Sequence, residues 1–192
     1  VAECATAMRK ASNGPEITIK CRIGVDDQIP ENVLPEFLSR VSAAGIRSFT
    51  VHARKAWLQG LSPKENRDVP PLDYNLVYEM KGLFPSLEIC INGGITSLDE
   101  AEAHLQAGVD GVMIGRSAYH EPAKVLVNAD QRIFGVANST TAEQAVLDML
   151  PYIEIELAKG ARLNQITRHM LGVFAGRPGA RRWRRVLSEG SH

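Results

Sequence analysis

The chain has 192 residues, enough for one domain and a small appendage, and its 44% hydrophobic and 23% charged residues are typical of a globular, soluble protein. No apolar run approaches the roughly 20 residues that a membrane helix needs, and no signal peptide is visible, which argues against a membrane or secreted protein. The formal net charge is zero, but residues 159–192 carry eight Lys and Arg against one acid, a balance of +7 that the rest of the chain offsets. A neutral protein with one basic end is a candidate for binding a polyanion there.

The three cysteines, Cys4, Cys21 and Cys90, are odd in number and widely spaced. They form neither a disulfide framework nor a metal-binding motif, so we expect no metal site and a reducing, cytoplasmic location. The sequence starts at Val1 without a methionine and enters an amphipathic pattern at once. We therefore expect it to be an excerpt of a longer polypeptide.

Two strand patterns in the first third of the chain each carry a pair of basic side chains. After a helix over 1–12, strands are expected over 17–24 and 48–54, separated by a helix over 32–44. Because side chains alternate along a strand, Lys20 shares a face with Arg22, and His52 shares a face with Arg54. Cations beneath a layer of helices are costly, so this face is expected to open into the mouth of a barrel. The alternative, that one cation pairs with an acid at a strand end, stays open.

Residues 55–72 show no helix or strand pattern. Unpatterned loops of this length in a compact domain are usually functional or disordered. This one contains Trp57, Lys64 and Arg67, and a nucleic acid would suit both the aromatic ring and the cations. A helix over 73–84 follows it.

The stretch 88–116 contains two short strand patterns, each ending in a glycine turn, with a helix between them that opens on the capping box Ser97-x-x-Glu100. Glycine turns after parallel strands let backbone N–H groups approach one phosphate, as in the loops after the last two strands of (β/α)₈ barrels. The residues of this predicted phosphate or phosphorylated-cofactor site are Asn92, Gly93, Gly94, Gly115 and Arg116. The alternative is that these glycines only make tight turns.

The element order predicts an α/β protein, namely the second half of a (β/α)₈ TIM barrel over 1–135 followed by a small α-helical domain over 136–192. A helix over 124–134 closes the first part. In the second part, a capping box at Thr140 is expected to open a helix to about 159, kinked at Pro151, and a further helix covers 162–175. The segment 180–185 then places Arg181, Arg184 and Arg185 on one side, leaving Trp183, Val186 and Leu187 to pack.

Five segments closely resemble the tRNA-dihydrouridine synthases, specifically their subgroup A: IKCRIGVDD, VHARKAWLQGLSPKENR, ICINGGI, GVMIGR and RHMLGVFAGRPGARRWRRVLSE. The resemblance covers essentially the whole chain. It implies an FMN enzyme with a (β/α)₈ catalytic barrel and a C-terminal helical domain that holds tRNA. Such enzymes reduce the C5–C6 double bond of uridine and use NADPH to recharge the flavin. For this subgroup the target is uridines 20 and 20a of the D-loop.

The resemblance also implies roles for individual residues. Lys20 and His52 match flavin-contacting positions, and the glycine turns match the grip on the FMN phosphate. Arg22 and Arg54 are expected to meet the flipped-out uridine or its phosphate. The cations that match tRNA contacts are Lys64, Arg67, Arg181 and Arg184.

One departure is serious, because the family's general acid is a cysteine on a loop from the first half of the barrel, which this sequence lacks. Cys21 and Cys90 do not match its position. We therefore expect the 192-residue chain alone to be inactive, to bind FMN weakly or not at all, and to self-associate through its exposed strands around Ile19 and Met113. Two alternatives stay open: a tRNA-binding module only, or another FMN-dependent TIM-barrel oxidoreductase acting on a small substrate.

Overall fold

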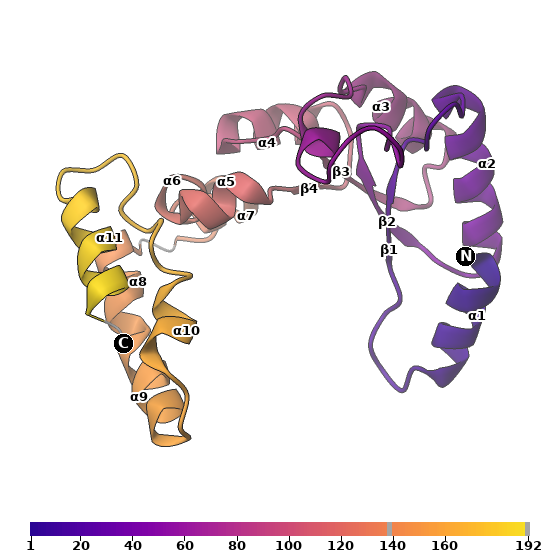
Figure 1. Cartoon of the computed structure of the whole chain (residues 1–192). Coiled ribbons are helices and arrows are strands. Elements are labelled where there is room, and N and C mark those ends of the chain that lie inside the picture. The colour runs from indigo at the N-terminus through magenta and orange to yellow at the C-terminus, as the bar shows by residue number, and fades with distance from the viewer. Residues whose placement is uncertain (138–139, 191–192) are drawn as a thin grey trace. The chain divides into compact units, whose positions relative to one another are not determined.

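The computed structural model describes residues 1–137 and 140–190, and it contains a sheet of four parallel strands. In the sheet these lie in chain order: β1 (Ile19–Arg22), β2 (Ser48–His52), β3 (Glu88–Asn92) and β4 (Gly111–Met113). Helices connect successive strands, as parallel pairing requires (Figure 1). The predicted α/β fold with parallel strands is confirmed.

The chain divides into two units, the first comprising Val1–Ile95 and Glu100–Ile114 and the second Thr96–Asp99 and Gly115–His192. The helices that lie wholly or mainly in the first unit are α1 (Ala2–Ala11), α2 (Pro30–Ala43), the short 3₁₀ helix η1 (Glu65–Arg67), α3 (Tyr74–Leu83) and α4 (Leu98–Gln106). The boundary between the units falls at Gly115, and the predicted domain division at 135/136 stays a prediction.

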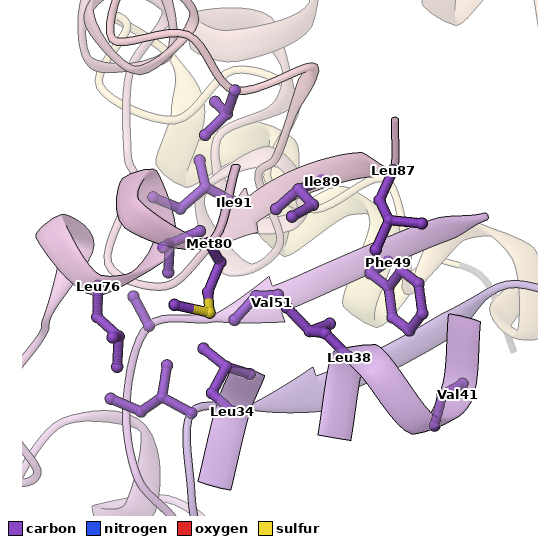
Figure 2. Packing of buried hydrophobic residues seen from close by; sticks show 14 of the residues in the cluster. Leu34, Leu38, Val41, Phe49, Val51, Leu76, Met80, Leu87, Ile89 and Ile91 are labelled. Carbon is purple, nitrogen blue, oxygen red and sulfur yellow. The ribbon is translucent and has the colours of Figure 1, made fainter. Parts of the chain in front are cut away.

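One face of the sheet forms the hydrophobic core with α2 and α3. Phe49 and Val51 of β2 and Ile89 and Ile91 of β3 are completely buried. They pack beneath apolar side chains of the two helices, which include Leu34, Leu38, Val41, Leu76, Val77 and Met80 (Figure 2). The strand residues that alternate with these four buried side chains of β2 and β3 point to the opposite face, which is polar and partly exposed. The sheet therefore has a covered apolar face and a polar face.

The two ends of the sheet are edge strands. Within the described residues, β1 pairs with β2 alone and β4 pairs with β3 alone. Backbone groups along the outer sides of β1 and β4 are therefore available for pairing with further strands.

The second unit is built from short helices. They are α5 (Arg116–His120), α6 (Pro122–Leu126), α7 (Ala129–Phe134), α8 (Ala142–Asp148), α9 (Leu150–Ala158), α10 (Leu163–Thr167) and α11 (Ala180–Glu189). Trp183 anchors α11, because its Nε1 donates to the carbonyl of Met170 at 2.9 Å and its ring meets Phe174 edge to face at 4.9 Å.

Several helix predictions in this unit are wrong in detail. The expected helix to 159 is interrupted at Met149, and Pro151 lies in the first turn of α9, where proline needs no hydrogen-bond partner. The N-cap of α8 is Thr141 rather than Thr140. The helix expected over 124–134 forms as α6 and α7.

The helix expected over 162–175 ends at Thr167 and gives way to tight turns. This segment passes close to the carbonyl oxygen of His120, and only glycine fits at position 172, because a Cβ there would lie 2.2 Å from that oxygen. Val186, expected to pack, is 54% exposed.

The part of the chain that the structure describes has no membrane-spanning helix and no cluster of metal-binding side chains. None of the helices there has both the length and the apolar character to cross a bilayer. In the same part of the chain, no three His, Cys, Asp or Glu side chains gather where they could hold a metal ion.

Candidate functional site

Three of the predicted site residues lie in one row at the carboxyl ends of the strands. The strand register pairs Arg22 with His52 and His52 with Asn92. Residues paired in register point to the same face, so these side chains lie on the polar face of the sheet, which Lys20 shares two residues earlier on β1. Ligands of parallel α/β sheets bind at the carboxyl ends of the strands, so this row is the candidate functional site.

The turn after β3 is held tightly in place. The Nδ2 group of Asn92 donates to the carbonyl of Met113 on β4 at 2.7 Å, and the hydroxyl of Tyr74 donates to the carbonyl of Gly93 at 2.6 Å. Gly93 and Gly94 have φ angles of +118° and +70°, which side-chain-bearing residues rarely adopt. Tight packing therefore explains part of the need for glycine, as the alternative interpretation expects, and the predicted phosphate contact stays a prediction.

The second predicted glycine turn follows β4. Gly115 precedes α5, and Arg116 is the first residue of that helix. Both residues belong to the second unit. Their predicted role at the phosphate stays a prediction.

The two arginines assigned to the substrate hold the loop 55–72. One terminal nitrogen of Arg22, Nη1, donates to the carbonyls of Lys55 and Asn66, both at 2.8 Å. The Nη1 group of Arg54 donates to the carbonyls of Asp68, at 3.2 Å, and Pro70. Each guanidinium group has further N–H groups beyond these contacts. The sequence did not indicate this bracing of the loop.

Positive charge gathers beside the row. Burial, followed by the neighbouring guanidinium groups of Arg54 and Arg67, lowers the pKa of Arg22. Burial and the charge of Arg22 lower the pKa of Lys20 in the same way. Within the described residues, Nε of Arg54 is buried without a hydrogen-bond partner. Mutually repelling cations and an unpartnered donor are arranged to accept an anionic or oxygen-rich ligand.

The two strand cysteines are not activated. Burial raises the pKa of Cys21 to about 11, and Cys21 lies on the core side of β1. Burial and then the acids Glu88 and Asp110 raise the pKa of Cys90. Both side chains are therefore thiols at neutral pH, and Cys90, in register with Thr50, lies on the polar face of the sheet.

Asn66 organises the loop and was missed by the sequence analysis. Its Nδ2 group donates to the carbonyls of Trp57 at 2.7 Å and Leu61 at 3.2 Å, and its Oδ1 accepts from the N–H of Trp57 at 2.7 Å. Beside it, Glu65, the first residue of η1, and Ser62 each accept a hydrogen bond from the other's backbone N–H. The Ser-x-x-Glu spacing is a capping-box pattern, so it was a signal that this loop is ordered.

The cations assigned to tRNA occupy exposed positions in both units. Lys64 and Arg67 are exposed around η1 in the first unit. Arg181 and Arg184, with their neighbours Arg182 and Arg185, are exposed on α11 in the second. None of the four α11 arginines is buried, so each can contact a ligand without unfolding the helix.

Comparison with known proteins identifies the family. The family model described as Dihydrouridine synthase (Dus) matches residues 1–192. The chain is 54% identical over 193 residues to the tRNA-dihydrouridine(20/20a) synthase of Shewanella oneidensis and 54% identical over 194 residues to that of Escherichia coli K12. It is covered completely in both cases, but it spans only 57% and 55% of those proteins.

The similarity of this chain to a solved structure is weaker than its similarity to these two sequences. A phosphoenolpyruvate phosphomutase from Streptomyces platensis covers 88% of this chain, and the chain covers 70% of it, with 17% identity and a TM-score of 0.46. Because the family model matches the chain from its first residue to its last, the chain belongs to the dihydrouridine synthase family.

Proposed function

We propose that this chain is the C-terminal part of a tRNA-dihydrouridine synthase that reduces uridine to 5,6-dihydrouridine in the D-loop of tRNA. By its resemblance to subgroup A, the targets are positions 20 and 20a. FMN is the proposed cofactor and NADPH the reductant that recharges it. The names of the relatives support the reaction, and the family membership supports the enzyme class.

The observation that carries the proposal is the row of Arg22, His52 and Asn92 on the polar face of the sheet. In a (β/α)₈ barrel the covered face packs under the helices and the other face lines the barrel. A parallel order, a polar second face and two edge strands are what half of such a barrel would leave. A barrel completed by the rest of the polypeptide therefore fits this sheet.

The residues on the polar face fit a flavin. Lys20 supplies a cation and His52 an imidazole that is only 9% exposed, and these groups would lie beside the ring, while the proposed phosphate contacts of the first unit come from Asn92, Gly93 and Gly94. When bound, FMN supplies the hydride. The positive charge of Lys20 and an N–H donor of His52 would stabilise negative charge on the reduced ring, and the low solvent access of His52 strengthens its hydrogen bond.

Substrate binding is proposed to use the cations around the row. The uridine must leave the base stack to reach a flavin on the sheet, and its phosphate or carbonyl oxygens would then meet Arg22 and Arg54. The buried Nε of Arg54 is a donor that such an oxygen would satisfy. The tRNA backbone would be held by exposed cations, namely Lys64, Arg67, Arg181 and Arg184.

The test compares the complete gene product with the 192-residue chain. With FMN, NADPH and an unmodified tRNA transcript, the complete product should form dihydrouridine, detected by mass spectrometry of the digested RNA. The 192-residue chain should form none, because it has no cysteine at the family's acid position to protonate C5. Failure of the complete product would refute the function, and turnover by the short chain would refute the role given to the missing half.

A matched pair of lysines tests the flavin contact. Lys20→Ala in the complete protein should weaken FMN binding and slow flavin reduction, measured from the flavin absorbance. Lys10→Ala removes an equal charge from an exposed position on α1 and should leave both unchanged. Equal behaviour of the two variants would contradict the placement of Lys20 beside the ring.

A role as a tRNA-binding module only is the second candidate, and the exposed arginines of α11 favour it for the 192-residue chain. Filter binding separates the candidates. A tRNA-binding chain should bind tRNA with an affinity that falls steeply with salt, since Lys and Arg contacts release counterions. An oxidoreductase for a small substrate should show no preference for tRNA.

A further inference from the structure

The backbone on both sides of Trp57 is fixed by side chains from elsewhere in the first unit. Asn66 binds the N–H and the carbonyl of Trp57, each at 2.7 Å. The next N–H, of Leu58, donates to Oδ1 of Asp26 at 2.7 Å. The carbonyl of Asn66 is in turn held by Arg22 at the end of β1. Trp57 is therefore presented by a rigid segment that is tied to the candidate site.

The indole ring is exposed although the backbone is fixed. Trp57 is 36% exposed, and Nζ of Lys55 lies 5.0 Å from the centre of its ring. A tryptophan in this position offers a large aromatic surface, and its pre-ordered backbone reduces the entropy lost on binding. The ammonium group of Lys55 adds a positive charge that would attract a phosphate.

The cations of the loop indicate the kind of partner. Lys55 lies over the ring, and Lys64 and Arg67 lie in the same loop, which also contains the acids Glu65 and Asp68. An aromatic surface among cations is the arrangement that single-stranded nucleic acids recognise, because bases stack on the ring and phosphates meet the cations. A protein partner would have no equal need for the cations.

We propose that Trp57 is a stacking platform for an unstacked nucleotide of the RNA substrate, distinct from the uridine that is reduced. Asn66 is the positioning residue that fixes this platform. The inference rests on the proposed function, because it takes RNA as the substrate. Stacking on Trp57 would add a contact to a base, whereas the cations proposed to hold the tRNA contact its backbone through charge.

The salt dependence of binding distinguishes stacking from charge. In the complete gene product, binding of an unmodified tRNA transcript is measured over a series of salt concentrations. Trp57→Ala should weaken binding roughly 5- to 150-fold without changing the slope of log affinity against log salt, because a stacked base releases no counterion. Lys64→Ala should instead reduce the slope by about 0.9. Trp57→Phe keeps an aromatic ring and should recover part of the affinity.

Leu58→Ala is the matched control. Leu58 is the neighbouring residue, is apolar and is 72% exposed, so its removal tests general loss of apolar surface in the same loop. The tRNA affinity of Leu58→Ala and the salt dependence of that affinity should equal those of the parent protein. Thermal midpoints and bound FMN, measured for every variant, show that each remains folded.

The role of Asn66 is tested through Trp57. Asn66→Ala should weaken tRNA binding in the presence of Trp57 but should have little further effect in a Trp57→Ala background, because the residue acts by holding the ring. Additive losses in the double variant would contradict this role.

Three outcomes would overturn the inference. Trp57→Ala could bind as tightly as the parent, it could reduce the slope as Lys64→Ala does, or Leu58→Ala could lose as much affinity as Trp57→Ala. In each case tRNA binding by the parent would still support the proposed function. If the parent protein bound no tRNA, the proposed function would fail together with the inference.

Discussion

Replacement of Gly94 by alanine tests the turn that is proposed to hold the FMN phosphate. The φ angle of Gly94 is +70°, and a Cβ there would lie 2.7 Å from Cδ1 of Leu72 and 3.1 Å from the hydroxyl of Tyr74. That hydroxyl is the donor to the carbonyl of Gly93. Gly94→Ala therefore strains the backbone and also pushes on the two side chains that support the turn.

The expected loss of stability has two parts. A side-chain-bearing residue with a left-handed backbone costs about 1–2 kcal/mol. Crowding of a packed region adds typically about 1–3 kcal/mol, and the flexible end of Leu72 places this variant in the lower half of that range. The free energy of unfolding should therefore fall by roughly 2–4 kcal/mol.

Gly108→Ala separates the two parts. Gly108 has a φ angle of +100°, and a Cβ there would meet nothing within 4 Å. Its replacement should therefore reduce the free energy of unfolding only by the backbone part, about 1–2 kcal/mol. Because the φ angle of Gly108 is the less favourable of the two, a greater loss at Gly94 must come from the contacts.

Urea denaturation of the complete protein measures both losses, with circular dichroism as the signal. In a Leu72→Ala background the effect of Gly94→Ala should shrink toward that of Gly108→Ala, because the closest contact is gone. Bound FMN, measured by absorbance after gel filtration, should fall for Gly94→Ala and stay unchanged for Gly108→Ala. Equal losses of stability at the two glycines would refute the packing argument, and unchanged FMN in Gly94→Ala would refute the cofactor role of the turn.

Three further predictions concern the sheet, the basic helix and the sheet edges. Burial alone would raise the pKa of Asp110. The pKa nevertheless lies below its ordinary value of 3.8, because the carboxylate is hydrogen-bonded to Lys81 and to the N–H of Ile89. This contribution to stability is present above pH 3.8 and is lost as the pH falls through the lower pKa of the folded state. In Asp110→Asn, the midpoint of urea denaturation should therefore depend less steeply on pH in the acid range. A pH profile equal to that of the parent would contradict this role of Asp110. Arg181→Ala and Arg184→Ala should each reduce the salt slope of tRNA binding by about 0.9 without changing the thermal midpoint, and a slope equal to the parent's would exclude a phosphate contact. The 192-residue chain should self-associate through β1 and β4 in small-angle scattering over a concentration series, whereas a monodisperse monomer would argue against pairing at these edges.

Local patterns in the sequence were sufficient to predict the order of the α-helices and strands in the first unit. The strands around Ile19, Phe49 and Ile89 are short β-branched or aromatic runs, and each is followed by residues that end a strand. Helices such as α3 have a clear start, since Asp73 caps it by accepting from the N–H of Leu76 at 3.0 Å. Such signals act over a few residues, so they can be interpreted without knowledge of the rest of the chain.

The second unit was predicted less well because contacts distant in sequence decide it. The periodicity of 162–175 favours one helix, but Gly172 must pass close to the carbonyl of His120, and the helix ends at Thr167. Helix periodicity reports which side chains could share a face, and it contains no information about a neighbour 52 positions away.

The sequence by itself determined which residues could serve the site: the basic pairs on β1 and at the end of β2, the glycine turn after β3 and the arginines of α11. Only the tertiary structure decided that Arg22, His52 and Asn92 share one row, because strand register depends on how α2 and α3 pack on the sheet. It also decided that Arg22 and Arg54 hold the carbonyls of the 55–72 loop and that Asn66 fixes Trp57. The physical reason is that a hydrogen bond between residues 44 positions apart, such as that from Arg22 to Asn66, exists only once the chain between them has folded.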